Sequence, residues 1–257
     1  MLQNKLTIIL PVYNGEDTIQ KTLDSVKNQK NKDFNFVVFD NNSSDDTLKL
    51  LEDFKLDNFI IQKRKKTVSM ADNWNCMIEF PETEYVCMIH GDDYYEPNFV
   101  DDVYHSMNSN FDLIVYNRNI VTHDADIINT ISYNKVTKLS LLERFPGIAY
   151  VWKKNKILTK FNPSFFPIFD YLWFYQNLPN CKTIDYVNKA LINITVGDHQ
   201  ITNQIKWEKG ILKTLLYVIF SINFKNSISE KAVAVSHLTR VLKNHIIKSI
   251  KTKIEKK

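Results

Sequence analysis

The chain has 257 residues, of which 44% are hydrophobic and 24% are charged, so it is long enough for a sizeable core and is unlike collagen-like, coiled-coil or wholly disordered proteins. Its five glycines never stand close together, which excludes a G-x-G-x-x-G dinucleotide fingerprint and a P-loop. The net charge of +4 arises in residues 206–257, which hold 12 Lys and Arg against 3 Asp and Glu, whereas the residues before them are net negative.

The cysteines and the apolar runs indicate the compartment. Cys76, Cys87 and Cys181 are odd in number and widely spaced, which favours neither a disulfide framework nor a zinc cluster and indicates a reducing environment. The apolar run at 6–12 is too short for the core of a signal peptide, and the run at 211–224 is shorter than the ~20 residues that cross a bilayer. We therefore expect a cytoplasmic protein without a transmembrane segment.

The first half of the chain alternates between two hydrophobic periods. Runs of β-branched and aromatic residues predict four strands, at residues 6–12, 34–39, 59–61 and 85–89. Apolar residues at helical spacing predict three helices between them, over 17–26, from an N-cap at Ser44 to Phe54, and over 68–80. Strands that alternate with helices predict an α/β fold with a Rossmann-like, mostly parallel sheet flanked by helices.

The second half of the chain has a less regular pattern. It predicts helices at 98–107, 139–145 and 153–159, a helix that begins near Asp170, and strands at 113–121, at 127–133 and twice within 184–196. From about residue 204 the chain is predicted to be helical and basic. We therefore expect one domain over residues 1–205 and a basic amphipathic helical extension over residues 206–257.

Three polar segments follow predicted strands, at 13–17, 40–46 and 91–95, on the edge where ligands of parallel sheets bind. Asp92 and Asp93 directly follow a buried strand, and two carboxylates there suit a hard divalent cation that also binds substrate phosphates. Each acidic segment also has ordinary turn or helix-cap composition. Their expected place on one edge of the sheet is therefore the stronger signal.

Four motifs occur in a characteristic order. They read Leu10-Pro-Val-Tyr-Asn14 with Glu16, Phe39-Asp-Asn-Asn-Ser-Ser-Asp-Asp-Thr47, Asn73-Trp-Asn75, and Tyr85-Val-Cys-Met-Ile-His-Gly-Asp-Asp93. In order and spacing they resemble the family 2 glycosyltransferases of the GT-A fold, of the kind that builds bacterial cell-surface glycans, over roughly residues 5–205. The chain departs from that family in having Asp40-Asn-Asn-Ser43 in place of Asp-Asp-Gly-Ser, so neutral Asn41 stands where the second acid would be.

The resemblance implies roles for individual residues. The residues that would bind the nucleotide-sugar are Pro11, Tyr13, Asn14, Glu16, Asp40, Asn42, Asn75 and Asp92. Of these, Tyr13 and Asp40 would face the uridine and Asp92 the ribose or the donor sugar. Asp93 would bind Mn²⁺ or Mg²⁺ on the diphosphate, and His199 would complete the metal shell or have a structural role. His90 is a second candidate histidine, which a solvent-facing turn explains equally well.

Transfer with inversion needs a carboxylate that takes the proton of the acceptor hydroxyl. The family places this base in a segment that opens a helix well after the acidic pair, and the matching residue is Asp170, the only acid between Glu143 and Asp185. Asp170 also suits a helix N-cap, and the two roles are compatible because helix starts favour carboxylates.

The tail has apolar residues at steps of three and four, interspersed with Lys and Arg, which predicts an amphipathic basic helix. These apolar residues are Ile228, Ala232, Val235, Leu238, Leu242, Ile246 and Ile250. The helix either packs on the domain or lies on an anionic membrane surface. The lipid-linked acceptors common in the family favour peripheral contact, at the inner face of the cytoplasmic membrane. The final 30 residues contain no aromatic residue, which argues against nucleic acid as a partner.

The leading hypothesis is an inverting, metal-dependent glycosyltransferase that moves a hexosyl or N-acetylhexosaminyl group from a nucleotide-sugar, a UDP-sugar by the resemblance. The acceptor would be a glycan or a lipid-linked molecule in cell-surface polysaccharide or lipopolysaccharide assembly. One alternative is a sugar-phosphate nucleotidyltransferase, which needs a glycine-rich basic loop after the first strand, whereas residues 11–18 contain one glycine and no Lys or Arg. Another is a catalytically inactive module that binds a nucleotide-sugar.

Overall fold

The computed structural model describes residues 4–197, 208–220 and 227–255. The chain divides into two compact units. The first comprises Met1–Asn134, Pro146–Ile157 and Cys181–Gly197, and the second comprises Lys135–Phe145, Leu158–Asn180 and Asp198–Lys257. The domain boundary expected after residue 205 lies outside the described residues and stays a prediction.

A nine-stranded sheet forms the centre of the first unit, in the order β3-β2-β1-β4-β8-β6-β9-β5, with β7 paired to β6. The strands are β1 (Leu6–Val12), β2 (Phe34–Asp40), β3 (Phe59–Lys63), β4 (Tyr85–Met88), β5 (Tyr94–Tyr95), β6 (Leu113–Val121), β7 (Ile127–Ile131), β8 (Tyr150–Lys153) and β9 (Ile184–Thr195). The first four are parallel to one another. β1, β2 and β4 are buried almost throughout, which is why their sequences are continuous apolar runs.

The other half of the sheet is mixed. β8 pairs antiparallel with both β4 and β6, β5 pairs antiparallel with β9, and β6 runs parallel to β9. Two expectations are wrong here, because residues 153–159 contain the end of β8 and a 3-10 turn (Lys154–Lys156) in place of a helix, and residues 184–196 contain the single strand β9. β8 lies between β4 and β6 and ends at Lys153, so the chain leaves the sheet only where the helix was expected to begin.

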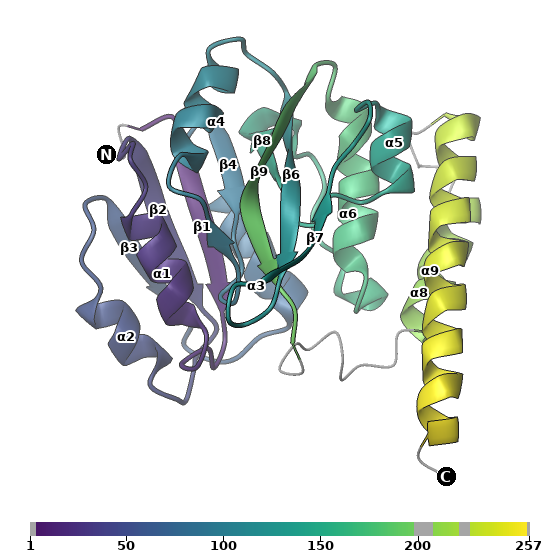
Figure 1. Ribbon diagram of the computed structural model, residues 1–257, viewed down its shortest axis with the longest axis horizontal. Coiled ribbons are helices and arrows are strands. Elements are labelled where there is room, and N and C mark those ends of the chain that lie inside the picture. Colours follow the sequence, from purple (N-terminus) through teal and green to yellow (C-terminus); the bar gives the residue numbers. More distant parts are fainter. Residues whose placement is uncertain (1–3, 198–207, 221–226, 256–257) are drawn as a thin grey trace. The chain divides into compact units, whose positions relative to one another are not determined.

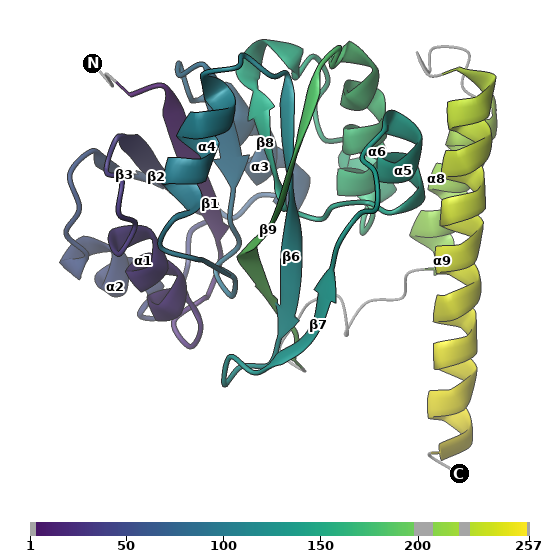
Figure 2. The same ribbon diagram turned by 45° about the horizontal axis from the view of Figure 1, so that its top comes forward.

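Helices cover both faces of this sheet (Figures 1 and 2). In the described part of the first unit, α1 (Ile19–Lys27), α2 (Thr47–Asp53) and α4 (Phe99–Met107) lie on one face, and α3 (Met70–Glu79) lies on the other. α1 buries the apolar residues whose spacing predicted it. α2 begins at Thr47 after Asp46, so Ser44 is not its N-cap as the sequence predicted.

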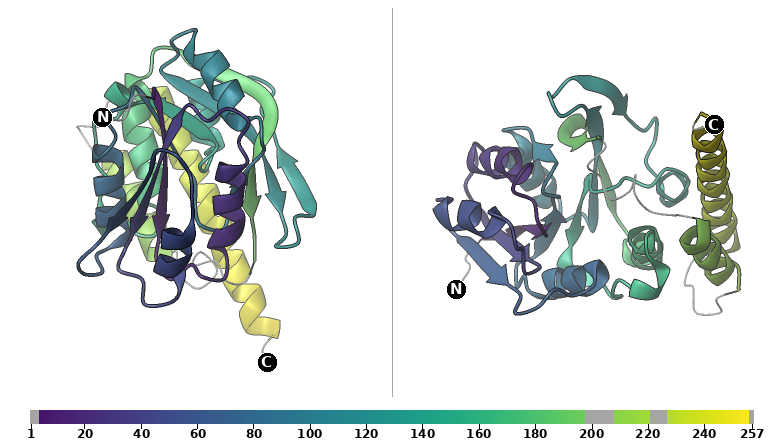
Figure 3. Two further views of the ribbon diagram at one scale, coloured as in Figure 1. Left: turned by 90° about the vertical axis from the view of Figure 1, so that its left-hand side faces the viewer. Right: turned by 90° about the horizontal axis from the view of Figure 1, so that it is seen from below.

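The second unit contains α5 (Lys138–Glu143), α6 (Phe169–Asn177), α8 (Glu208–Phe220) and α9 (Ile228–Glu255). Figure 3 shows α8 and α9 side by side, and the two helices are in contact. The Tyr175 hydroxyl of α6 donates a hydrogen bond to Leu142 O of α5 (3.2 Å), and His237 Nδ1 of α9 contacts Glu143 O. These contacts join the helices around a common apolar core.

α9 buries part of the predicted stripe. Leu238 is buried and Val235 is half-buried, whereas Ile228 is 89% exposed and Ala232 is also exposed. Ala234, which the sequence did not place on the stripe, is buried as well, and α9 contacts both α5 and α8. Among the helices that the structure describes, none is long and apolar enough to cross a membrane.

Candidate active site

The segment that follows β4 contains the acidic pair. Asp93 is 2% exposed, its Oδ1 accepts a hydrogen bond from Thr195 N at the end of β9 (2.9 Å), and its Oδ2 lies 3.5 Å from His90 Nδ1. Burial raises the pKa of Asp93 to about 6, although the contact with His90 opposes the shift. Asp92 is half-buried. The two adjacent carboxylates therefore have different environments.

α1 holds the backbone of the same segment. Thr22 is fully buried, and its hydroxyl lies 2.7 Å from Asp93 O and 3.3 Å from His90 O. One turn further on, Ser25 Oγ accepts a hydrogen bond from Tyr95 N (3.2 Å). Two polar side chains of α1 thus form hydrogen bonds with the backbone of the segment that follows β4.

Three side chains of this segment converge. The ligand atoms of His90, Asp92 and Asp93 lie within 4.8 Å of one another. The imidazole of His90 stacks on the indole of Trp74 from α3, with ring centroids 5.4 Å apart and planes inclined by 30°. Two carboxylates and one imidazole form a donor set that divalent metal ions accept. The residues present therefore fit the metal that the sequence predicted at this edge of the sheet.

The loops after β1 and β2 are bonded to each other. Asn14 N donates to Ser43 Oγ (2.9 Å), and Asn14 Oδ1 accepts from Ser44 N (2.9 Å). The carboxylate of Glu16 accepts from Asp46 N (2.7 Å). Two residues predicted to bind the nucleotide-sugar thus use their side chains to join the two loops.

Gly15 lies in the middle of this junction. Its N–H donates to Thr47 Oγ1 (2.7 Å), and a Cβ at this position would lie 2.9 Å from Val12 Cγ2. The preceding Asn14 has a left-handed φ of 49°, a conformation that asparagine tolerates better than most residues. The close approach of the turn to β1 therefore requires glycine at position 15.

Asp40 is fully buried at the end of β2, where its two carboxylate oxygens accept from Ser43 N (3.1 and 3.3 Å). Asn41 forms a two-way pair with Val68, donating to Val68 O (2.9 Å) and accepting from Val68 N (3.0 Å). Asn42 has a φ of 64° and donates to Thr67 Oγ1 (3.4 Å). The neutral Asn41 that replaces an acid therefore tethers the segment before α3 to the loop after β2.

The remaining residues predicted for the donor differ in exposure. Tyr13, directly after β1, is 51% exposed. Pro11 lies beyond Ile9, the last residue of β1 that pairs with β4, so its missing N–H leaves no gap in that ladder. Asn75 is half-buried in α3.

Asp170 lies in the second unit, in the first turn of α6, and is half-buried. Its Oδ1 accepts a hydrogen bond from Tyr171 N (2.9 Å). The predicted helix start near Asp170 is confirmed, although the N-cap is Ile168 and not Asp170. The role of Asp170 as a base stays a prediction. His199 lies outside the described residues.

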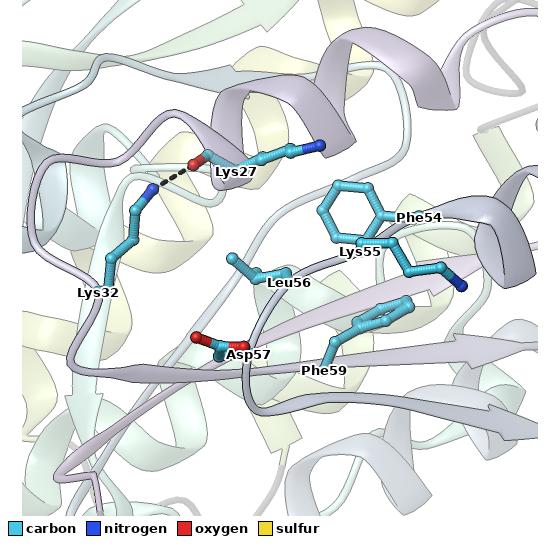
Figure 4. A pocket seen from close by; sticks show the side chains of 7 residues that line it. All are labelled: Lys27, Lys32, Phe54, Lys55, Leu56, Asp57 and Phe59. Atoms are coloured by element: carbon cyan, nitrogen blue, oxygen red, sulfur yellow. Dashed lines mark hydrogen bonds between the residues drawn. The ribbon is translucent and has the colours of Figure 1, made fainter.

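A hollow of about 620 Å³ lies where β2 and β3 begin, whereas the loops described above follow the ends of β1, β2 and β4. It is lined by Lys27, Lys32, Phe54, Lys55, Leu56, Asp57 and Phe59 (Figure 4). Lys32 Nζ donates to Lys27 O across it. With one carboxylate and three lysines, this hollow lacks the donor set that a metal on a diphosphate requires.

The sequence did not predict the residues that contact His90 and Asp93 and hold them in place. Thr195 is 102 positions from the carboxylate that it contacts, and no local pattern signals such a contact. Thr22 had one available signal, because it is a polar residue on an otherwise apolar helix face. Trp74 was predicted to be a core residue, and it is buried, but its stacking on His90 was not predicted.

Comparison with known sequences extends over most of the first unit. Residues 7–174 match the family model Glycosyl transferase family 2. UDP-Glc:alpha-D-GlcNAc-diphosphoundecaprenol beta-1,3-glucosyltransferase WfaP of Escherichia coli is 25% identical over 144 residues, which are 56% of this chain and 57% of WfaP. Poly(ribitol-phosphate) beta-N-acetylglucosaminyltransferase TarP of Staphylococcus aureus (strain N315) is 25% identical over an alignment of 93% of this chain and 80% of TarP. The chain thus spans little more than half the length of WfaP.

Comparison with solved structures agrees in fold. The structure of S. aureus TarS in complex with UDP-GlcNAc superposes with a TM-score of 0.75 and 19% sequence identity, over 92% of this chain and 72% of the TarS chain. At this identity the match shows the fold alone. It confirms the expected α/β fold of the GT-A type.

Proposed function

Because the chain belongs to glycosyl transferase family 2, we propose that it transfers a sugar, with inversion, from a UDP-sugar to a glycan or lipid-linked acceptor in cell-surface polysaccharide or lipopolysaccharide assembly. The observation that carries the proposal is the convergence of His90, Asp92 and Asp93 at the carboxyl end of β4. A Cβ at Gly91 would lie 3.9 Å from Val12 Cγ2 at the end of β1. The group therefore adjoins the loops proposed to bind the donor.

The choice of a UDP-sugar is supported by two similar proteins. The name of WfaP specifies UDP-Glc, and the TarS structure contains UDP-GlcNAc. In this chain we assign the exposed ring of Tyr13 to the uracil, with Asp40 beside it, and Asp92 to the ribose or the donor sugar. Asn14 and Glu16 contribute by holding the loops after β1 and β2 together.

The metal and the base have separate tasks in this proposal. Mn²⁺ or Mg²⁺ bound at Asp93 and its neighbours, with His199 as a further ligand, would supply positive charge that offsets the charge of the departing diphosphate. Thr195 N and His90 hold the Asp93 carboxylate in place for this purpose. Asp170, in the first turn of α6, accepts the proton of the acceptor hydroxyl.

Peripheral membrane contact is the remaining part of the proposal. The name of WfaP specifies an acceptor linked to diphosphoundecaprenol, a lipid that is held in a membrane. In this chain the outer side of α8 presents four exposed apolar residues, Leu212, Leu216, Ile219 and Phe220, with exposed Lys213 beside them. Residues 206–257 carry a net charge of +9. An apolar helix face in a basic segment suits the surface of an anionic bilayer.

The transferase activity is tested with a panel of UDP-, GDP- and TDP-sugars in Mn²⁺, by following nucleotide release and then transfer to the acceptor. We expect release from a UDP-sugar. Asp93→Asn should weaken UDP binding in Mn²⁺, measured by calorimetry, because it removes a charged group and keeps the shape. Asp170→Asn should lower the transfer rate by about 10²- to 10⁴-fold and leave UDP affinity within a few-fold. Asp101→Asn, at an exposed position of α4, is the control and should change neither.

Each outcome bears on a different part of the proposal. Unchanged UDP affinity in Asp93→Asn would contradict the metal assignment. Transfer at the parental rate by Asp170→Asn would mean that another group is the base or that the reaction retains configuration. UDP binding without transfer from any donor would favour the inactive binding module.

Membrane contact is tested by co-sedimentation with vesicles of phosphatidylglycerol and phosphatidylcholine. Leu216→Glu and Phe220→Glu should abolish binding to the anionic vesicles, and Ser236→Glu, at an exposed polar position of α9, should weaken it only slightly. Binding should fall as salt is raised, because salt screens the attraction between the basic segment and the anionic lipids. The Debye length is about 10 Å at 0.1 M and becomes shorter at higher salt. Equal sedimentation of all variants would contradict the assignment of this face.

A further inference from the structure

We propose that the basic run Lys63–Lys66 binds phosphate groups of the acceptor, which is then a molecule that carries several phosphates. The inference rests on the proposed function, because it names the chemistry of the acceptor in that reaction. The run reads Lys63-Arg-Lys-Lys66 and differs from its surroundings, since the first unit holds 17 Lys and Arg against 23 Asp and Glu. Four consecutive cations in an acidic unit create a local positive field that attracts anions.

The run begins where β3 ends, at the edge of the sheet that carries the loops proposed to bind the donor. Lys63 is the partner of Asp40 in the register of β3 and β2, and Arg64 N donates a hydrogen bond to Asp40 O (2.9 Å). Just after the run, Thr67 Oγ1 accepts from Asn42 Nδ2 (3.4 Å). An anion bound to the run would therefore lie beside the segment proposed to hold the uridine.

Hydrogen bonds fix the backbone on both sides of the run. Arg64 Nε donates to Asn73 Oδ1 of α3 (3.1 Å), and Val68 forms its two-way pair with Asn41. The cations thus project from an ordered loop that is tied to both β2 and α3. An ordered loop loses less conformational entropy when a ligand binds than a flexible one does.

The positive charge of the run is largely uncompensated. Lys65 and Lys66 are exposed, and within the part of the chain that the structure describes neither forms an ion pair or a side-chain hydrogen bond. Lys63 is also exposed, and it lines a hollow of about 300 Å³ together with Arg64 and Glu79. An acid therefore offsets charge only at the start of the run, and the lysines at its other end repel each other until an anion binds.

The neighbours of the run favour a phosphate-bearing acceptor over a bilayer surface. Contact with an anionic bilayer combines basic charge with an apolar face that enters the lipid. The only apolar side chain within residues 62–69, Val68, is half-buried. Besides the donor, the acceptor is the molecule that the proposed reaction brings to this edge of the sheet, and lysine ammonium groups bind phosphate as point charges.

The first test uses inorganic polyphosphate as the probe, without added metal, on the unaltered chain. Acetylation of lysines, followed by mass spectrometry, measures which ammonium groups the probe covers. We expect polyphosphate to slow the acetylation of Lys63, Lys65 and Lys66 several-fold and to leave Lys30 and Lys49, which are also exposed, nearly as reactive as before. Equal protection of all five lysines, or protection of none, overturns the inference.

The second test measures the affinity for polyphosphate by calorimetry. The double variant Lys65→Glu, Lys66→Glu should bind at least about tenfold more weakly than the parent, because it replaces two cations by anions. The matched double variant Lys30→Glu, Lys49→Glu makes the same change of charge outside the run and should bind like the parent. Equal losses in the two double variants overturn the inference, because net charge alone would then explain both.

Two further measurements separate the acceptor from other anions. The affinity of Lys65→Glu, Lys66→Glu for UDP in Mn²⁺ should stay within a few-fold of the parent, and a loss as large as that for polyphosphate would assign the run to the donor. Loss of binding to phosphatidylglycerol vesicles with unchanged polyphosphate binding would assign it to a membrane. Either result overturns the inference and leaves the proposed transferase standing. Selective protection of the run in a chain that transfers sugar from no donor would instead contradict the proposed function and leave the phosphate site standing.

Discussion

Replacing Thr22 by valine tests whether α1 positions the metal group. The substitution preserves the shape of the side chain and removes the hydroxyl, which lies 2.7 Å from Asp93 O and 3.3 Å from His90 O in a fully buried place. Loss of one partner of a buried hydrogen bond costs about 1–3 kcal/mol. Thr22→Ser keeps the hydroxyl and loses one buried methyl, which costs about 1 kcal/mol.

The assay has two readouts. Urea unfolding should show the valine variant to be less stable than the parent by about 1–3 kcal/mol, equivalent to roughly 2–4 °C of Tm for each kcal/mol. Calorimetry with UDP and Mn²⁺ should show weaker binding for Thr22→Val and near-parental binding for Thr22→Ser, because the bonded carbonyls belong to His90 and Asp93.

Two results would refute this reasoning. A valine variant as stable as the parent would show that the hydroxyl contributes nothing to the fold. A valine variant that is destabilised and yet binds Mn²⁺ and UDP as tightly as the parent would show that the bond does not position the ligands.

Three further predictions concern other contacts. Gly15→Ala should weaken UDP binding several-fold and lower stability by about 1–3 kcal/mol, because its Cβ would lie 2.9 Å from Val12 Cγ2; parental affinity would show that the turn has room. Burial lowers the pKa of His237, so the free energy of unfolding should fall as pH drops below the unfolded value of about 6.5; urea titrations at pH 5–8 should give a smaller fall for His237→Gln, and an equal fall would assign it to other groups. Asp112→Ala should lower stability by about 1–3 kcal/mol in urea unfolding, because it removes the oxygen that accepts from Lys182 N (2.6 Å) and from the next backbone N–H (3.2 Å); an unchanged midpoint would contradict this.

Much of the first unit could be predicted from local pattern. The runs at 6–12, 34–39 and 85–89 are strands because chains buried on both faces of a sheet need continuous apolar residues, and the structure places strands at all three. The polar segments that follow these runs lie at the strand ends, because the chain leaves the buried sheet there. The strand β8 was not predicted, because it is stabilised by pairing with β4 and β6, which no local pattern contains.

The candidate site was also predicted only in part. The acidic pair was visible because two carboxylates follow a buried strand, yet the pair does not reveal that Asp93 is buried against Thr195 N while Asp92 remains half-exposed. Asn14 and Glu16 were predicted to bind the donor, and the structure shows that their side chains also bond to the loop after β2. A sequence shows which polar residues end a strand, but their partners depend on which strands become neighbours.

The amino-acid sequence by itself determined the α/β class, the parallel strands β1 to β4, and the loops that carry the candidate donor and metal residues. These features depend on hydrophobic period and on turn-forming residues, which act over a few positions. Only the tertiary structure decided the mixed half of the sheet, the buried stripe of α9 and the stacking of Trp74 on His90. Such contacts join residues that are distant in sequence, and they form because packing buries more apolar surface and pairs more polar groups than any local arrangement does.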